Sequence, residues 1–448
     1  MAVWARAYLT ATLPVIALVS PPGRAPALEA CWPGWRGQGQ GLAAADTRIP
    51  LEWNETKNVL WKSALPGRGL SSPIVWGDRI FLTTAVEGDV VPDVQRMRHF
   101  QPDGTEFRHP DALGDDRKHG LELLALDARS GRLLWQRRLW EGVPSGARHK
   151  KGSFASPTPV TDGERVYAYF GTEGLYAYDF EGRPAWKFDP GTVATFSVGV
   201  GTSPVLYGDL VILLADEDNG DRSYIAGIDR RTGALVWRTP RKVELSWATP
   251  VVVDAAGRDE LVTAGNQASI AYDPKSGREL WRVQGLASNA VATPLLGDRV
   301  VVFTTGYPSK LSMAVRPGGS GDVTGAVLWR YDKGSAYVSS PVLYDGHVYL
   351  ASDRGLLTCL DAQTGAVRYE GRRLPVPATL MASPIAVDGR VLFMSQEGDT
   401  FVVKAGPEFA VERVNPLGEA IGASPAVAGN VLYIRGERHL FAIGYGPK

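Results

Sequence analysis

A Ser-Pro or Thr-Pro dipeptide followed by an apolar run recurs eight times along this chain of 448 residues. The prolines lie 41 to 47 residues apart, except for a first interval of 84 residues. A fixed period of this length is typical of the four-stranded blades of a β-propeller. The eight dipeptides are Ser72-Pro73, Ser156-Pro157, Ser203-Pro204, Thr249-Pro250, Thr293-Pro294, Ser340-Pro341, Ser383-Pro384 and Ser424-Pro425. The repeat therefore predicts eight structural units.

Each unit has the same internal order. After the proline come a strand, a Gly/Asp turn, a second strand rich in β-branched and aromatic residues, and a third strand that ends in Asp. A Ser/Thr-Gly turn and a fourth strand with an aromatic residue follow. The terminal aspartates include Asp127, Asp179, Asp229 and Asp361, and the aromatic residues are Trp135, Trp186, Trp237, Trp281, Trp329 and Tyr369. The pattern predicts an all-β, eight-bladed β-propeller of four-stranded antiparallel blades.

The repeated residues have structural roles. An Asp at the end of a strand can accept hydrogen bonds from turn amides, and Gly supplies the positive φ that a tight turn requires. A large aromatic side chain offers an apolar face that packs between blades. The periodic aspartates are therefore assigned to turns and not to catalysis.

The two ends of the repeat predict how the ring closes. The last unit reaches Ile443 without a fourth strand, whereas a strand with Trp61 precedes the first unit. We expect this N-terminal strand to complete the last blade, because an unpaired sheet edge is a liability. The expected domains are a signal peptide (1–30), an N-terminal extension (31–52) and the propeller (53–445). The long first interval predicts a polar surface insertion over 86–120 in blade one.

The first thirty residues predict export. An apolar stretch follows Arg6, and Ala25-Pro26-Ala27 is an A-x-A cleavage site. The stretch is too short for a transmembrane helix, so we expect no membrane span and a periplasmic or secreted protein. A lipid on Cys31 is the alternative, since residues 28–31 faintly resemble a lipobox. Lys plus Arg and Asp plus Glu each number 48, which argues against nucleic-acid binding.

The repeat unit at 124–135 and at 225–237 resembles the PQQ-like β-propeller repeat, and the resemblance extends from about Trp53 to Ile443. The opening Trp32 to Gly37 is similar to the start of many exported, uncharacterised bacterial members. The resemblance implies one of two kinds of function. Some members are quinoprotein dehydrogenases with pyrroloquinoline quinone (PQQ) and calcium on the axis, and another is a non-enzymatic lipoprotein of outer-membrane barrel assembly.

Two sets of residues are candidates for a cofactor or a metal. The resemblance makes Trp247 a candidate stacking floor for PQQ, although a blade-packing role is the favoured interpretation. The acidic loop offers Asp216, Asp218 and Asp221 as calcium ligands, because calcium prefers six to eight oxygens. The alternative is a solvated acidic loop, since no glutamate closes an EF-hand pattern. The insertion histidines His99, His109 and His119 lack zinc-ligand spacing, and we expect them at the surface.

Three functional hypotheses follow. The first is a non-catalytic binding or scaffold propeller of the bacterial cell envelope that docks a protein partner through loops on one face. The second is a PQQ-dependent oxidoreductase that acts on an alcohol or a sugar. The third is a propeller that binds a polysaccharide or a peptide. The first is preferred because the sequence carries an enlarged loop and no recognisable catalytic motif.

Overall fold

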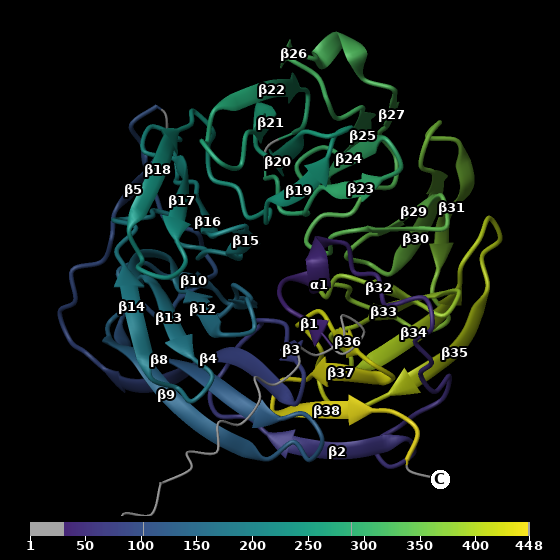
Figure 1. Ribbon diagram of the computed structural model, residues 1–448, viewed down its shortest axis with the longest axis horizontal. Coiled ribbons are helices and arrows are strands. Elements are labelled where there is room, and N and C mark those ends of the chain that lie inside the picture. The colour runs from purple at the N-terminus through teal and green to yellow at the C-terminus, as the bar shows by residue number, and fades with distance from the viewer. Residues whose placement is uncertain (1–30, 102, 288, 447–448) are drawn as a thin grey trace, which may run out of the picture.

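A computed structural model describes residues 31–101, 103–287 and 289–446; the predicted signal peptide, residues 1–30, lies outside them. Within these ranges, eight sheets of at least four strands surround a central axis (Figure 1). The first strand of each repeat unit lies nearest the axis and contacts its neighbours there. The predicted all-β, eight-bladed propeller is therefore confirmed.

The first four blades are antiparallel four-stranded sheets, with one extra short strand in blades 1 and 4. Blade 1 contains β3 (Ile74–Trp76), β4 (Arg79–Val90), β8 (Arg117–Asp127) and β9 (Leu133–Gly142), with β1 (Cys31–Trp32) added beside β3. Blade 2 contains β11 (Val160–Thr161), β12 (Arg165–Tyr169), β13 (Leu175–Asp179) and β14 (Pro184–Phe188). Blade 3 contains β15 (Val205–Tyr207), β16 (Leu210–Ala215), β17 (Tyr224–Asp229) and β18 (Leu235–Pro240). Blade 4 contains β19 (Val251–Asp254), β20 (Asp259–Thr263), β21 (Ala268–Tyr272) and β22 (Glu279–Gln284), with β26 (Gly321–Asp322) parallel to β22.

The remaining blades follow the same plan. Blade 5 contains β23 (Leu295–Gly297), β24 (Val300–Thr305), β25 (Leu311–Val315) and β27 (Trp329–Tyr331). Blade 6 contains β28 (Val342–Tyr344), β29 (His347–Ala351), β30 (Leu356–Asp361) and β31 (Val367–Arg373). Blade 7 contains β32 (Ile385–Val387), β33 (Arg390–Met394), β34 (Asp399–Lys404) and β35 (Val411–Pro416). Blade 8 contains β36 (Ala426–Ala428), β37 (Val431–Arg435), β38 (His439–Ile443) and β2 (Val59–Ala64). The helices of the described ranges are α1 (Arg36–Gly39) and the short 3-10 helices η2 (Gly171–Glu173) and η3 (Thr324–Ala326), and none is long and apolar enough to cross a membrane.

Blade 8 joins the two ends of the chain. Strand β2 pairs antiparallel with β38, with Lys62 opposite Phe441. The indole Nε1–H of Trp61 donates to the carbonyl oxygen of Ala128 in blade 1, 3.1 Å away. The strand that the sequence assigns to the last blade thus contacts both the last blade and the first.

Tryptophan side chains link successive blades on the face that carries the Ser/Thr-Gly turns, between the third and fourth strands of each blade. Trp186 of blade 2 donates from Nε1 to the carbonyl oxygen of Arg230 in blade 3, at 3.0 Å. The same side chain lies against Gly233, where an added Cβ would come within 2.7 Å of its Cδ2. Trp135 and Trp329 make the equivalent hydrogen bonds to blades 2 and 6. The repeated Trp and Gly therefore form one contact between adjacent blades.

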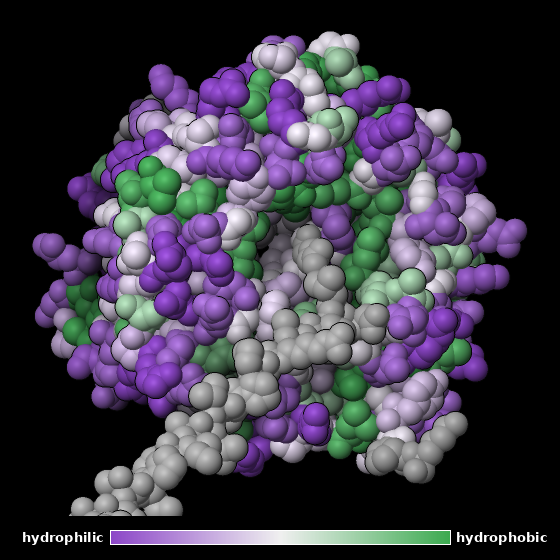
Figure 2. Space-filling model, in the orientation of Figure 1, coloured by the Kyte–Doolittle hydropathy of each residue, from purple (hydrophilic) through white to green (hydrophobic). Residues whose placement is uncertain are grey.

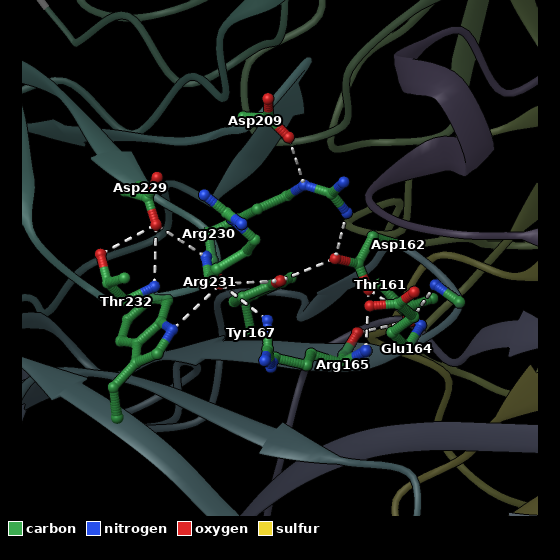
Figure 3. Close-up of polar contacts among 12 residues, drawn as sticks. Thr161, Asp162, Glu164, Arg165, Tyr167, Asp209, Asp229, Arg230, Arg231 and Thr232 are labelled. Carbon is green, nitrogen blue, oxygen red and sulfur yellow. Dashed lines mark hydrogen bonds and ion pairs between the residues drawn. The ribbon is translucent and has the colours of Figure 1, made fainter.

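The aspartate at the end of the third strand closes the adjoining turn, as the sequence predicts. Asp229 Oδ1 accepts hydrogen bonds from the backbone N–H of Arg231 and from the N–H and hydroxyl of Thr232 (Figure 3). Between the same two blades, Arg230 bridges Asp162 at 2.7 Å and Asp209 at 3.3 Å (Figure 3). Apolar side chains of neighbouring blades pack together between these polar contacts.

Near the axis, the hydroxyls of the repeat signature link blade to blade. The N–H of Ser72 donates to Thr158 Oγ1, the N–H of Thr158 to Ser203 Oγ, and the N–H of Ser203 to Thr249 Oγ1, at 2.9, 2.9 and 3.0 Å. Blades 5 to 8 repeat the pattern through Thr293, Ser340, Ser383 and Ser424. In blade 2 the position belongs to Thr158-Pro159, so the assignment of Ser156-Pro157 is wrong by two residues. We call these linked residues the hydroxyl belt.

The N-terminal extension crosses the end of the axis at which the first and second strands of each blade turn. Ala43 N–H donates to the carbonyl oxygen of Ala386 in blade 7, and the N–H of Leu296 in blade 5 donates to Gln40 Oε1, both at 2.9 Å. Helix α1 lies over the centre of the ring, on the face nearest the viewer in Figure 1. The insertion leaves blade 1 at the far end of β4 and β8, so it belongs to the opposite face. We call that face the insertion face.

Candidate functional site

A cavity of about 1060 Å³ lies on the propeller axis. Its wall includes the hydroxyl-belt residues Thr249, Thr293, Ser340, Ser383 and Ser424, together with loops of the insertion face. Trp35 of the N-terminal extension also lines it and donates from Nε1 to Thr293 Oγ1 at 2.9 Å. From the side of α1, Figure 2 shows the ring hollowed near its centre. The cavity is thus bounded by the extension at one end and by the insertion at the other.

The rest of the wall combines aromatic rings with few charged groups. The aromatic residues are Trp35, Phe107, Phe196, Trp247, Tyr307 and Tyr337. Asp353 is the carboxylate among the lining residues, and Lys151 is the ammonium group. Burial raises the pKa of the Asp353 carboxyl, and its Oδ1 has no hydrogen-bond partner within the described protein. The wall therefore presents one carboxylate among aromatic rings and hydroxyl groups.

The insertion folds into two small sheets. Strand β5 (His99–Phe100) pairs with β6 (Glu106–Phe107), and β7 (Ala112–Leu113) pairs with β10 (Arg148–His149) from the connection between blades 1 and 2. Because half of the second sheet lies outside the insertion, that sheet fixes the insertion to the ring.

Polar contacts fasten the insertion to blade 3 and to itself. His99 Nδ1 lies 2.6 Å from Asp218 Oδ2, and the neighbouring Asn219 Nδ2 donates to the carbonyl oxygen of Phe100 at 2.8 Å. Within the insertion, Arg108 binds Asp115 through two hydrogen bonds of 2.7 and 2.8 Å. The insertion is therefore a structured element that is hydrogen-bonded to the ring.

The surface location expected for the insertion histidines is wrong for two of them. His99 and His119 are each 2% exposed, whereas His109 is half-buried. His99 is buried because it bonds to Asp218, and His119 is buried because β8 extends further than the repeat suggests, which places its ring against Phe154. Burial lowers the pKa of His119.

The three carboxylates expected as calcium ligands have separate partners. Asp216 pairs with the buried Arg241 at 3.1 Å and accepts a hydrogen bond from Ser246. Asp218 binds His99 and the backbone N–H of Phe196. Asp221 is exposed. The structure thus does not bring these carboxylates together, because two of them bind protein cations or donors in the core.

Trp247, the candidate for stacking a cofactor, does line the cavity. Its Nε1 donates to the carbonyl oxygen of Gly199 at 2.9 Å, and its ring lies beside Gly201. The indole is therefore held in place by the connection between blades 2 and 3, with part of its surface toward the cavity.

Sequence reasoning missed a third group at the rim of the cavity. His109, Asp111 and His149 place one potential ligand atom each within 4.8 Å of one another, and all three are half-buried. They are the one such His/Cys/Asp/Glu cluster among residues 31–101, 103–287 and 289–446. No spacing in the sequence could reveal it, because the pairing of β7 with β10 brings His149 to the insertion.

The comparisons with known proteins agree with the propeller. A family model described as outer membrane protein assembly factor BamB matches residues 119–224, 221–315 and 319–407, and no curated protein matches. Among solved structures, BamB from Moraxella catarrhalis is similar with a TM-score of 0.55 and 15% identity, over 82% of this chain and 99% of that chain. Quinohemoprotein alcohol dehydrogenase from Comamonas testosteroni is similar with a TM-score of 0.62 and 11% identity, over 94% of this chain and 82% of that chain.

At these identities the structural likeness shows the fold alone, and one fold of this kind hosts several functions. The family match is of a different kind, because its three segments run almost without a break from blade 1 to blade 7. The chain therefore belongs to the PQQ-like β-propeller repeat family described as outer membrane protein assembly factor BamB.

Proposed function

We propose that this chain is a non-catalytic binding propeller of the bacterial cell envelope, which docks a protein partner through the loops of the insertion face. The observation that carries the proposal is an anchored insertion with apolar side chains in solvent. Val90, Phe100 and Leu113 are 58%, 40% and 48% exposed. Apolar side chains held in solvent on a structured loop favour an interaction with a partner, because removing apolar surface from water lowers the free energy.

The anchoring of the insertion favours tight binding of a partner. A loop held by buried contacts loses little conformational freedom when a partner docks, so more of the interaction free energy appears as affinity. The His99–Asp218 and Asn219–Phe100 contacts supply that order next to the exposed Phe100 ring. The family description, an assembly factor of the outer membrane, supports a protein partner and an exported location, periplasmic or secreted.

Release after export is preferred to a lipid anchor on Cys31. Cys31 lies in β1, in register with Trp76 of blade 1, and is half-buried there. A lipid on this residue would have to leave directly from the innermost strand of blade 1, near the axis of the ring, without a tether.

The alternative of a PQQ-dependent alcohol or sugar oxidoreductase fits the cavity poorly. Trp247 lies where its ring could stack on a quinone. Calcium, however, prefers six to eight oxygen ligands, and Asp353 is the one carboxylate of the described lining. PQQ itself carries several carboxylates, for which the lining offers one lysine, Lys151. A polysaccharide or peptide ligand is better matched, because aromatic walls suit sugar rings and extended chains.

Site-directed photocrosslinking in the native envelope tests the docking surface. A photoreactive phenylalanine analogue replaces Phe100 or Leu113 on the insertion face, and Leu133 serves as the control. Leu133 is 45% exposed and begins β9, on the face of the ring opposite the insertion. We expect positions 100 and 113 to crosslink the same discrete protein. The crosslink from position 100 should be lost in a Leu113→Asp background, and the crosslink from position 113 in a Phe100→Asp background. Equal crosslinking from position 133, or none from the insertion, would refute this surface.

A further inference from the structure

We propose that His109, Asp111 and His149 form a binding site for a divalent transition-metal ion, best suited to zinc, at the rim of the axial cavity. This site is independent of the docking surface proposed above. Two imidazoles and one carboxylate are a common donor set for zinc.

The separations among the three groups suit a small ion. His149 Nε2 lies 3.4 Å from Asp111 Oδ2. Tetrahedral zinc with bonds of about 2.1 Å places two of its ligand atoms about 3.4 Å apart, so this pair already has the required separation. The three ligand atoms lie within 4.8 Å of one another, so side-chain rotations can bring them to the separations of a zinc site without movement of the backbone.

The backbone around the ligands is held by hydrogen bonds. His149 is in register with Ala112 in the β7–β10 pair, and the N–H of Lys150 donates to the carbonyl oxygen of Asp111 at 2.8 Å. The N–H of Ala112 donates to the carbonyl oxygen of His109 at 3.0 Å. Ligands carried on paired strands need little ordering when an ion arrives, which favours binding.

The surrounding polar groups leave the metal-facing atoms available. Lys150 Nζ binds Asp111 Oδ1 at 2.9 Å, so Oδ2 is left for the ion. Nδ1 of His109 and of His149 each accept a backbone N–H two residues ahead, at 3.1 Å. Binding through Nε2 transfers each ring proton to Nδ1 and opens these two hydrogen bonds, whose N–H groups then bond to water. Metal binding is therefore expected to displace only local contacts.

The position of the cluster gives the bound ion a further role. His109 and His149 both line the axial cavity, so an ion bound to them would lie at the cavity wall. Three protein ligands with an open fourth position are typical of zinc sites that accept an external donor. We expect that donor to be a water molecule or an oxygen or sulfur atom of whatever enters the cavity.

Titration of the untagged, metal-free protein with zinc chloride by isothermal calorimetry tests the site, with cobalt(II) absorption as a second readout. We expect one ion per chain with a dissociation constant of about 10 µM or lower. His109→Ala, His149→Ala and Asp111→Asn should each weaken binding at least about tenfold. His347→Ala, which removes a histidine of blade 6 outside the cluster, should leave it unchanged.

Two outcomes overturn the proposal. One is the absence of stoichiometric zinc binding by the unsubstituted protein, a result that does not depend on any variant. The other is binding that persists in a folded His109→Ala/His149→Ala double variant, which would place the ion elsewhere. Thermal melts of each variant establish folding, and crosslinking from position 100 reports separately on the docking surface.

Discussion

His99 Nδ1 lies 2.6 Å from Asp218 Oδ2, and both side chains are almost entirely closed off from solvent. This contact joins blade 1 to blade 3 across the insertion face, without involving blade 2. The second oxygen of the same carboxylate accepts the backbone N–H of Phe196. Asp218 therefore holds the insertion and a cavity-lining loop at once, which explains why an acidic residue is buried in this position.

Replacing Asp218 with Ala should release the insertion. The change leaves the His99 ring and the Phe196 N–H buried without an acceptor, at a cost of about 1–3 kcal/mol for each unsatisfied group. We expect hydrogen exchange at 91–116 to accelerate while the strands of blades 4 to 7 keep their protection.

Arg98→Ala is the control for that experiment. It removes the ion pair of Arg98 with Glu106, which is in the same insertion but exposed at the surface. Exposed pairs contribute little to stability, so exchange should stay as in the unsubstituted protein. Acceleration in both variants, or in neither, would contradict the assigned role of Asp218.

Gly233→Ala should destabilise the ring at the boundary of blades 2 and 3. Gly233 has φ +75°, and its Cβ would lie 2.7 Å from Cδ2 of Trp186. The left-handed backbone alone costs about 1–2 kcal/mol with a side chain, and the clash adds about 1–3 kcal/mol. Gly346→Ala is the matched control, since its φ is +72° and no atom lies within 4 Å of the added Cβ. Urea unfolding should give the larger loss for Gly233→Ala; equal losses would show that the tryptophan contact contributes nothing.

Asp353→Asn should stabilise the protein at neutral pH and lose that advantage in acid. Burial raises the pKa of the Asp353 carboxyl, so the folded state binds its proton more tightly than the unfolded state does. The contribution of this group to stability is therefore greatest below the ordinary pKa of Asp and falls as the pH rises through the raised value. The free energy of unfolding of the variant minus that of the unsubstituted protein should increase between pH 4 and pH 7. A difference that is constant with pH would rule out this carboxyl as the cause.

PQQ with calcium should leave the melting temperature unchanged. A ligand at one hundred times its dissociation constant adds about 2.7 kcal/mol, enough to raise the melting temperature of a protein of this size by a few degrees. We expect no such rise. Calcium prefers six to eight oxygen ligands, whereas Asp353 is the one carboxylate among the described residues that line the cavity. A clear increase that disappears in Trp247→Ala would instead support the oxidoreductase hypothesis.

The sequence predicts the architecture because each element of the repeat has a local cause. Asp229, Trp186 and Gly233 occupy the same places in their units as their counterparts elsewhere, and the structure gives them one shared role. The register of blade 2 escapes this reasoning, since two consecutive Ser/Thr-Pro dipeptides, at 156–157 and 158–159, occur there. The hydrogen bonds of Thr158 with Ser72 and with Ser203 decide between them.

The site is less predictable because it depends on contacts between distant segments. Asp218 resembles a metal ligand in the sequence, yet His99, more than one hundred residues earlier, occupies its carboxylate. Conversely, His109 and His149 lack any recognisable spacing and become neighbours through the β7–β10 pair. Insertions break the period, so the repeat carries no information about where their side chains go.

The pairing of β2 with β38 also sets an order of events during biosynthesis. The ribosome makes β2 among the first strands and β38 last, so blade 8 cannot assemble until the whole propeller has left the ribosome. Contacts between such distant segments form slowly, and open strand edges are prone to aggregation meanwhile. The ring therefore stays open, with the edges of β2 and of the growing last blade unpaired, until β38 has been made.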